Sequence, residues 1–159
     1  MILAKNIHKF YDNKHILKGI DINVNKGEII SLVGASGAGK TTLLQILGTI
    51  DNYDKKESST LLLNNHDISI MSDNELARFR NQEIGFVFQF HQLLPEFTAI
   101  ENICIPAFIN KTPKKIAETK AKELMDYLGI ITRTNNKPNE LSGGEKQRVA
   151  VARSLINEP

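Results

Sequence analysis

The chain has 159 residues, about the size of one domain, and 41% of them are hydrophobic, which is enough for a core. Its net charge of +2 is small and its lysines are spread along the chain, so charge gives no support for nucleic-acid binding. The only cysteine, Cys104, lies in an apolar run, which predicts a buried, unreactive thiol and excludes an internal disulfide. No apolar run is long enough to span a bilayer, so we expect any membrane role to come through a partner.

The N-terminal region predicts a small antiparallel sheet lying beside a parallel one. Apolar and polar residues alternate with period two over Ile20–Asn25, as in a strand with one face in water. Asp12–Lys14 is typical of a turn, which leaves Tyr11 near an edge of the sheet. An aromatic ring at such a position usually serves packing, so position alone does not make Tyr11 a ligand contact.

A glycine-rich stretch, Gly34–Thr41, fits the phosphate-binding pattern G-x-x-x-x-G-K-[ST]. The apolar run Ile29–Val33 predicts a buried strand before it, and Leu43–Leu47 predicts a helix after it. Glycines allow turns that bring consecutive backbone N–H groups within reach of phosphate oxygens, and a helix start adds further N–H donors. The alternative is a glycine-rich turn between strand and helix that binds nothing.

The side chains of this stretch have expected parts in nucleotide binding. Lys40 would neutralise the β- and γ-phosphates, and the hydroxyl of Thr41 would hold a magnesium ion. The nucleotide-binding residues expected here are Gly34, Ala35, Ser36, Gly37, Ala38, Gly39, Lys40, Thr41 and Thr42.

The middle of the chain predicts two further strands and a helix. Thr60–Leu63 predicts a short strand, closed by a tight turn at Asn64-Asn65. Ser72–Glu75 has the spacing of a capping box, so a helix is expected to begin there. Ile84–Phe88 predicts another buried strand, which ends at Gln89.

Residues 90–141 predict an all-helical insert between strands of an α/β core. Ile103 and Cys104 follow Ile100 at helical spacing. A second helix is expected to begin at the cap and proline Thr112-Pro113 and to stop at Gly129. Its expected apolar face consists of Ala117, Ala121, Leu124 and Leu128.

The last helix is expected to begin at Ser142, because Ser142 and Glu145 again have capping-box spacing. The glycines at its first two positions, Gly143 and Gly144, each cost about 1 kcal/mol of helix stability relative to alanine. That cost is unusual unless another group approaches the backbone there, so this helix start is a second candidate phosphate site. Spacing alone leaves an ordinary N-cap equally open.

Three separated motifs together resemble the ATP-binding cassette (ABC) ATPases over the entire chain. Leu141–Arg148 resembles the signature sequence of that family, and Phe86–Gln89 lies between it and the phosphate loop, in the family's order. The resemblance implies an α/β P-loop NTPase (RecA-like) core with an N-terminal antiparallel β subdomain and an all-helical insert. It divides one ABC ATPase domain into a nucleotide-binding core (1–89), a helical subdomain (90–141) and a signature helix (142–159).

Phe88–Asn102 narrows the resemblance to the cytoplasmic ATPase subunit of lipoprotein-releasing transporters, more than to relatives in macrolide export or cell division. The function implied is ATP binding and hydrolysis that drives transport, at the cytoplasmic face of the inner membrane as a peripheral subunit. Alternatives are another ABC export or cell-division ATPase, a soluble ABC protein of translation or DNA repair, or a nucleotide-binding regulator that does not hydrolyse ATP.

The resemblance also implies roles that spacing does not give. Tyr11 matches the aromatic residue on which adenine stacks, and Gln89 matches the glutamine that reaches the magnesium ion and the attacking water. The Gln89 loop is also where integral membrane subunits make contact. Ser142, Gly143 and Gly144 match the residues that close on the γ-phosphate of ATP held by the other subunit of a head-to-tail homodimer. The implied cofactors are ATP and Mg²⁺, with Lys40 and Gln89 as catalytic residues and Thr41 and Gln89 near the metal.

The sequence departs from the family pattern at its end and in one loop. Pro159 is the last residue, and in the family it leads into a strand that ends in a magnesium-binding aspartate and a catalytic glutamate. We therefore expect a longer protein, and weak or no nucleotide binding and no turnover by these 159 residues alone. Relatives usually carry glycines where Ser59 and Asn65 stand, which leaves the turn geometry there open.

Overall fold

The computed structural model describes residues 1–159, and their packing divides them into two compact units, Met1–Leu76 and Ala77–Pro159. The first unit contains an antiparallel sheet and the helix that follows the phosphate loop. The second unit consists of helices joined by loops and short 3₁₀ turns.

The sheet of the first unit has the strand order β2-β1-β3-β4, and every neighbouring pair is antiparallel. The long hairpin of β1 and β2 confirms the predicted turn at residues 12–14, and β3 has the predicted bounds. Asn64 and Asn65 close the next hairpin with φ angles of 47° and 65°, which short polar side chains tolerate best. The strands are β1 (Ile2–Tyr11), β2 (Lys14–Val24), β3 (Thr60–Leu63) and β4 (His66–Asp67).

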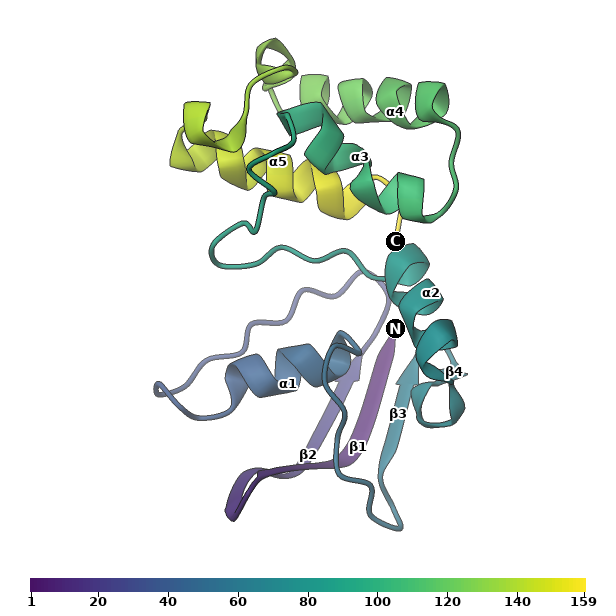
Figure 1. The fold of residues 1–159 in the computed structure, drawn as a ribbon. Coiled ribbons are helices and arrows are strands. Elements are labelled where there is room, and N and C mark those ends of the chain that lie inside the picture. Colours follow the sequence, from purple (N-terminus) through teal and green to yellow (C-terminus); the bar gives the residue numbers. More distant parts are fainter. The chain divides into compact units, whose positions relative to one another are not determined.

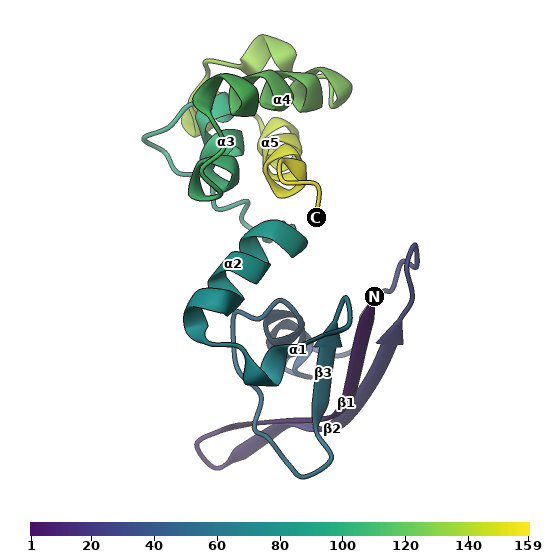
Figure 2. The same cartoon turned by 90° about the vertical axis from the view of Figure 1, so that its right-hand side faces the viewer.

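Helix α1 (Lys40–Leu47) begins within the glycine-rich stretch, directly after Gly39, and contains the predicted helical run Leu43–Leu47. Figures 1 and 2 show it lying alongside the sheet of β1, β2 and β3. Its apolar residues Leu43 and Ile46 are buried, together with Leu17 of β2 and Leu61 of β3. This burial fixes the start of α1 beside the β1–β2 hairpin.

Helix α2 (Asp73–Glu83) follows a 3₁₀ turn (Ile68–Ile70) and confirms the predicted capping box. The backbone N–H and the hydroxyl of Ser72 both donate to Oε2 of Glu75, at 2.8 and 2.7 Å. These bonds satisfy polar groups at the helix start that the helix itself leaves without partners.

The second unit is built around three helices that pack on one another, as Figure 2 shows: α3 (Ala99–Ile109), α4 (Lys114–Tyr127) and α5 (Gly143–Leu155). Two 3₁₀ turns, Ile131–Arg133 and Pro138–Glu140, connect α4 to α5. The buried core contains most of the predicted apolar positions, but Leu124 and Leu128 are only partly buried against it. The sequence reading did not include Ala99, Ala107, Met125, Ile130 or Leu141. The members of the core are Ala99, Ile100, Ile103, Cys104, Ala107, Ala117, Ala121, Met125, Ile130, Leu141, Val149, Ala152 and Ile156.

The ends of α4 confirm one prediction and correct another. Gly129 has a φ of 67° just beyond the helix, as expected for a C-terminal glycine. At the other end, Pro113 rather than Thr112 is the N-cap, and the helix begins at Lys114. Pro113 has an extended ψ of 138°, and its carbonyl accepts hydrogen bonds from the N–H groups of Ile116 and Ala117.

Two predicted buried strands, Ile29–Val33 and Ile84–Phe88, are not strands in this structure. Ile29 is 97% exposed and Val33 is 88% exposed. A strand requires hydrogen bonds to a neighbouring strand, and no other segment of residues 1–159 pairs with either run. The expected parallel sheet is therefore absent from these residues, and the prediction that a strand ends at Gln89 was wrong.

Candidate functional site

A cavity of about 320 Å³ in the first unit brings Tyr11 together with the glycine-rich stretch. Tyr11 comes from the end of β1, and the remaining walls come from β2, the loop and the first turn of α1. Sequence reasoning missed Ile16 as a wall residue, because nothing in the spacing of β2 marks it. The lining residues are Tyr11, Ile16, Ser36, Gly37, Gly39, Lys40, Thr41 and Thr42.

All three glycines of the loop, Gly34, Gly37 and Gly39, have positive φ angles that favour glycine. Gly37 and Gly39 have φ angles of 80° and 88°, in the left-handed region that residues with a Cβ rarely adopt. A Cβ on Gly39 would also lie 2.9 Å from Cδ2 of Leu17 and 3.1 Å from Cγ2 of Ile16. Gly39 is therefore needed both for the turn into α1 and for the close approach of the loop to β2.

Lys40 ties the two ends of the loop together. Its Nζ donates to the carbonyl oxygens of Gly34 and Ala35, at 2.9 and 2.7 Å. The loop therefore folds around the ammonium group of Lys40, which lines the cavity. The first turn of α1 has no acidic residue, so the positive end of the helix dipole and the charge of Lys40 act together. The site is therefore suited to a phosphate group.

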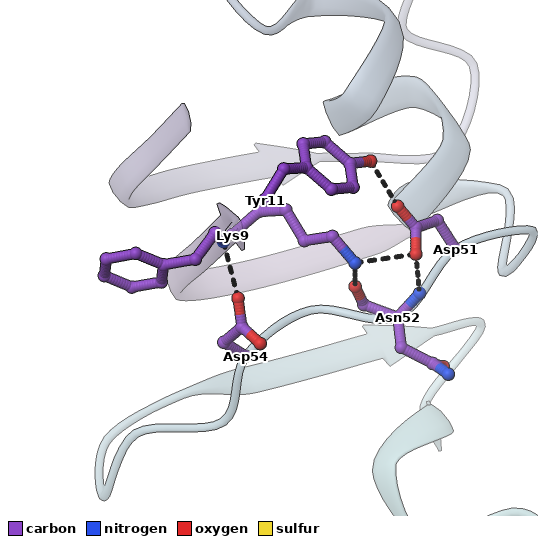
Figure 3. Close-up of polar contacts among 6 residues, drawn as sticks. Lys9, Tyr11, Asp51, Asn52 and Asp54 are labelled. Carbon is purple, nitrogen blue, oxygen red and sulfur yellow. Dashed lines mark hydrogen bonds and ion pairs between the residues drawn. The ribbon is translucent and has the colours of Figure 1, made fainter. Parts of the chain in front are cut away.

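The hydroxyl group of Tyr11 is anchored by a polar network that Figure 3 shows. It donates to Oδ2 of Asp51 at 2.6 Å, while Nζ of Lys9 donates to Oδ1 of Asp51 at 2.7 Å and to the carbonyl of Asn52. Asp54 accepts a hydrogen bond of 2.6 Å from the N–H of Phe10. The network attaches the loop after α1 to the end of β1.

The ionisation of this network follows from its hydrogen bonds. The pKa of Tyr11 is raised, chiefly by the hydrogen bond to the Asp51 carboxylate and to a smaller extent by desolvation. The phenol therefore stays protonated. Desolvation would raise the pKa of Asp51, but the hydrogen bonds from Lys9 and Tyr11 outweigh it and lower that pKa. Asp51 is thus an anionic acceptor between two donors. Sequence reasoning missed Asp51 and Lys9, because a polar loop residue and an alternating strand lysine carry no distinguishing pattern.

Gly34, Ala35 and Ala38 were also predicted to bind nucleotide, but they do not line this cavity. The other predicted site residues belong to the second unit. Gln89 is exposed and follows the non-strand segment 84–88. Ser142 is the N-cap of α5: its hydroxyl accepts from the N–H of Glu145 at 3.3 Å and its own N–H donates to Oε2 of Glu145 at 2.8 Å, which confirms the predicted capping box. Hydrogen bonds from Ser142 and from Arg133 lower the pKa of Glu145 to about 2.

Gly143 and Gly144 are exposed and are not required by packing within the unit. No atom lies within 4 Å of a Cβ built on Gly143, and the nearest atom for Gly144 is a flexible Arg148 nitrogen at 3.7 Å. The N-cap accounts for Ser142 but gives no reason for two glycines. Their bare backbone is open to a group from outside the unit.

The residues present fit a magnesium ion bound together with a nucleotide, and not a metal centre held by protein alone. No group of three or more His, Cys, Asp or Glu side chains could hold a metal ion. Thr41 lines the cavity, and Mg²⁺ usually takes one or two protein ligands with phosphate oxygens and water.

None of the helices has the length and apolar character needed to cross a membrane.

Comparison with known proteins agrees with this geometry. Residues 17–159 match the family model described as ABC transporter. The chain is 55% identical over 159 residues to the lipoprotein-releasing system ATP-binding protein LolD of Bacteroides fragilis (strain YCH46), covering 100% of this chain and 72% of that protein.

Two solved structures are similar over 100% of this chain and 71% of their own chains. One is the dimeric bacterial ABC transporter cassette MJ0796, with a TM-score of 0.89 and 35% sequence identity. The other is the dimer of the same cassette after hydrolysis, bound to ADP and Pi, with a TM-score of 0.88 and 34% identity. The chain belongs to the ABC transporter family and has the fold of its ATPase cassettes.

Proposed function

We propose that this protein is the ATP-binding subunit of a lipoprotein-releasing ABC transporter, which binds and hydrolyses ATP to drive release of lipoproteins from the inner membrane. The observation that carries the proposal is the cavity in which Tyr11 faces the glycine-rich loop, Lys40 and the start of α1. The 55% identity to LolD supports lipoproteins as the transported class of molecule.

In this proposal each wall of the cavity binds one part of ATP. Adenine stacks on Tyr11, and the phosphates lie against the backbone of residues 34–39 and the first turn of α1, including Thr41 and Thr42. The ammonium of Lys40, which donates to two loop carbonyls, turns its donors to the β- and γ-phosphates. Mg²⁺ would neutralise charge on the same phosphates, with Thr41 as a ligand and Gln89 near the metal and the attacking water.

The second half of the proposal concerns two copies of the protein. Ser142, Gly143 and Gly144 of one protomer close on the γ-phosphate of ATP held by its partner, in a head-to-tail homodimer. The exposed glycines with no internal packing role support this, as do the dimeric relatives. ATP binding and dimer closure then become one coupled event, because each nucleotide contacts both chains.

Membrane subunits are proposed to contact the Gln89 loop, with this protein peripheral at the cytoplasmic face of the membrane. Hydrolysis is proposed for the intact protein, in which a carboxylate orients the attacking water. We expect the 159 residues alone to show weak or no nucleotide binding and no turnover. Measurable hydrolysis by these residues that disappears in Lys40→Ala would contradict that expectation.

The nucleotide sandwich is tested with the intact protein and a non-hydrolysable ATP analogue plus Mg²⁺. We expect dimers by light scattering for the wild type, and monomers for Lys40→Ala, which loses nucleotide affinity. A Ser142→Tyr variant should bind nucleotide normally yet stay monomeric, because its added ring blocks closure. A wild type that stays monomeric at saturating analogue would contradict the proposed dimer.

The proposed cargo, an acylated lipoprotein, is tested in vesicles that contain the intact protein and the membrane subunits with which it assembles. ATP should release an acylated lipoprotein from these vesicles, and Lys40→Ala should abolish the release. Coupled ATP hydrolysis without lipoprotein release would refute the proposed cargo while leaving the ATPase function standing.

A further inference from the structure

We propose that Arg153 is a positioning residue that holds the segment around Gln89 against the C-terminal end of α5. The proposal rests on the function proposed above for Gln89, because it concerns how that residue is kept in place. Arg153 does not touch nucleotide in this proposal and acts only through the backbone of the neighbouring segment.

The guanidinium of Arg153 grips two consecutive backbone carbonyls. Its Nη2 donates to the carbonyl of His91 at 2.6 Å, and its Nη1 donates to the carbonyl of Gln92 at 2.8 Å. The planar fork of arginine suits such a pair of acceptors, whereas a lysine ammonium would meet them from a single point. Two bonds from one rigid group fix both the position and the direction of the segment.

The backbone that receives these bonds is held in an unfavourable conformation. His91 and Gln92 have φ angles of 60° and 47°, in the left-handed region that non-glycine residues seldom occupy. The N–H of His91 donates back to the carbonyl of Phe88 at 3.0 Å, so Gln89 lies within this turn. Strained backbone of this kind persists only where its surroundings hold it, and here Arg153 is the side chain that does so.

A second contact anchors the other end of the segment to the adjacent residue of α5. A Cβ on Gly85 would lie 2.4 Å from the carbonyl oxygen of Ser154, so the two backbones touch. Residues 85 and 91–92 are thus attached to residues 154 and 153 of the same helix. Gln89 lies exposed between these two contacts.

The charged guanidinium of Arg153 donates hydrogen bonds to these carbonyls and forms no ion pair. The ion pairs of residues 1–159 do not include Arg153, and burial lowers its pKa. A partly buried guanidinium that meets only carbonyl dipoles has a directional, structural task. Because Ser142 is the N-cap of α5, roughly 16 Å from Arg153 along the helix axis, one helix joins the signature residues to the Gln89 segment.

The first experiment measures local order in the intact protein by hydrogen exchange of backbone amides. In Arg153→Gln we expect amides of residues 86–92 to exchange at least tenfold faster, while those of α3 and α4 keep wild-type rates. Arg78→Gln removes an exposed arginine from α2 of the same unit and serves as the matched control. Unchanged exchange at residues 86–92, or an increase that extends through α3 and α4, would overturn the positioning role.

The second experiment separates binding from turnover. Arg153→Gln should lower kcat for ATP at least fivefold with KM within twofold of the wild type, and Arg153→Lys should recover only part of kcat. Gly85→Ala, which pushes the segment off α5 by a different route, should lower kcat in the same way. A normal kcat in Arg153→Gln would overturn the inference.

A double variant distinguishes this inference from the proposed function of Gln89. If Arg153 acts through Gln89, Gln89→Ala with Arg153→Gln should lose no more kcat than Gln89→Ala alone. Fully additive losses would overturn the inference and leave the role of Gln89 intact. A normal kcat in Gln89→Ala would instead refute the proposed role of Gln89, whatever the exchange data show for Arg153.

Discussion

Asp51 accepts a hydrogen bond of 2.6 Å from the hydroxyl of Tyr11, although 40 positions separate them in the sequence. The bond anchors the exposed aromatic ring beside the phosphate loop, while Lys9 holds the other carboxylate oxygen. The loop that follows α1 therefore sets the position of a residue at the end of β1 (Figure 3).

Two substitutions at Tyr11 should distinguish the contribution of its ring to ATP binding from that of its hydrogen bond to Asp51. Tyr11→Ala removes the stacking surface and should weaken ATP binding by roughly 10- to 100-fold, as expected for about 1–3 kcal/mol of stacking. Tyr11→Phe keeps the ring but loses the bond to Asp51, so we expect a loss of only about threefold. The measurement is a titration of the intact protein with a fluorescent ATP analogue. Equal affinities of Tyr11→Ala and wild type would exclude this ring as the adenine contact.

Alanine at Gly39 should be more harmful than alanine at Gly27, although both glycines have left-handed φ angles, of 88° and 83°. At Gly27 nothing lies within 4 Å of the new Cβ, so only backbone strain remains, about 1 kcal/mol. At Gly39 the Cβ also meets Leu17 and Ile16, and we expect a loss of about 2–3 kcal/mol with impaired nucleotide binding. Urea unfolding and nucleotide titration check this. Equal behaviour of the two variants would show that the loop relaxes freely.

The capping carboxylate of α5 should make stability depend on pH in acid. The pKa of Glu145 is lowered from 4.5 to about 2, first by the backbone N–H of Ser142 and then by Arg133. A carboxyl whose pKa is lowered by folding stabilises the protein above its unfolded pKa. Its contribution is therefore complete above about pH 4.5 and is lost as the pH falls towards 2.

The test is thermal unfolding of the wild type and of Glu145→Gln between pH 6 and pH 2, followed by circular dichroism. The variant should show a smaller fall in Tm across this range. Glu123→Gln, on the exposed surface of α4, is the matched control and should keep the wild-type profile. Identical profiles for Glu145→Gln and wild type would contradict the assignment of this cap.

Asn102 should be essential to the loop that precedes α3. Its side chain is fully buried, accepts from the N–H of Leu94 at 2.8 Å, and donates to the carbonyls of Leu94, Phe97 and Thr98. Asn102→Ala leaves the N–H of Leu94 and the carbonyl of Phe97 without this partner, while the carbonyls of Leu94 and Thr98 keep backbone N–H donors, and it should cost about 2–3 kcal/mol.

Asn102→Asp is the sharper variant, because a carboxylate would place negative charge among those carbonyl acceptors. We expect it to destabilise the protein more than alanine does, with the difference shrinking at a pH where the carboxyl is protonated. Urea unfolding at two pH values measures both effects. An Asp variant as stable as the wild type at neutral pH would contradict the donor role of this amide.

Cys104 should be inert in the native protein. It is 1% exposed, and burial raises its pKa to about 11, so little thiolate forms near neutral pH. Iodoacetamide at pH 8 should label it only after denaturation, as mass spectrometry can show. Rapid labelling of the folded protein would place the thiol at the surface and contradict the packing of α3.

The sequence by itself determined the features whose physical cause is local. Capping chemistry located Ser72 and Ser142, because each hydroxyl accepts a hydrogen bond from the backbone N–H three residues later. Turn chemistry located Asn64-Asn65, because short polar residues tolerate the positive φ angles of a tight turn. The glycine-rich loop and the start of α1 were equally predictable, since backbone freedom and helix start lie in adjacent residues.

Only the tertiary structure decided which distant groups meet. Ile29–Val33 has the composition of a buried strand, but a strand needs a hydrogen-bonded neighbour, and none of residues 1–159 provides one. No short-range pattern indicates the hydrogen bond from Tyr11 to Asp51. The same holds for the bonds from Arg153 to the carbonyls of His91 and Gln92. Spacing encodes contacts within one turn or hairpin, whereas these contacts arise only after separate elements have packed.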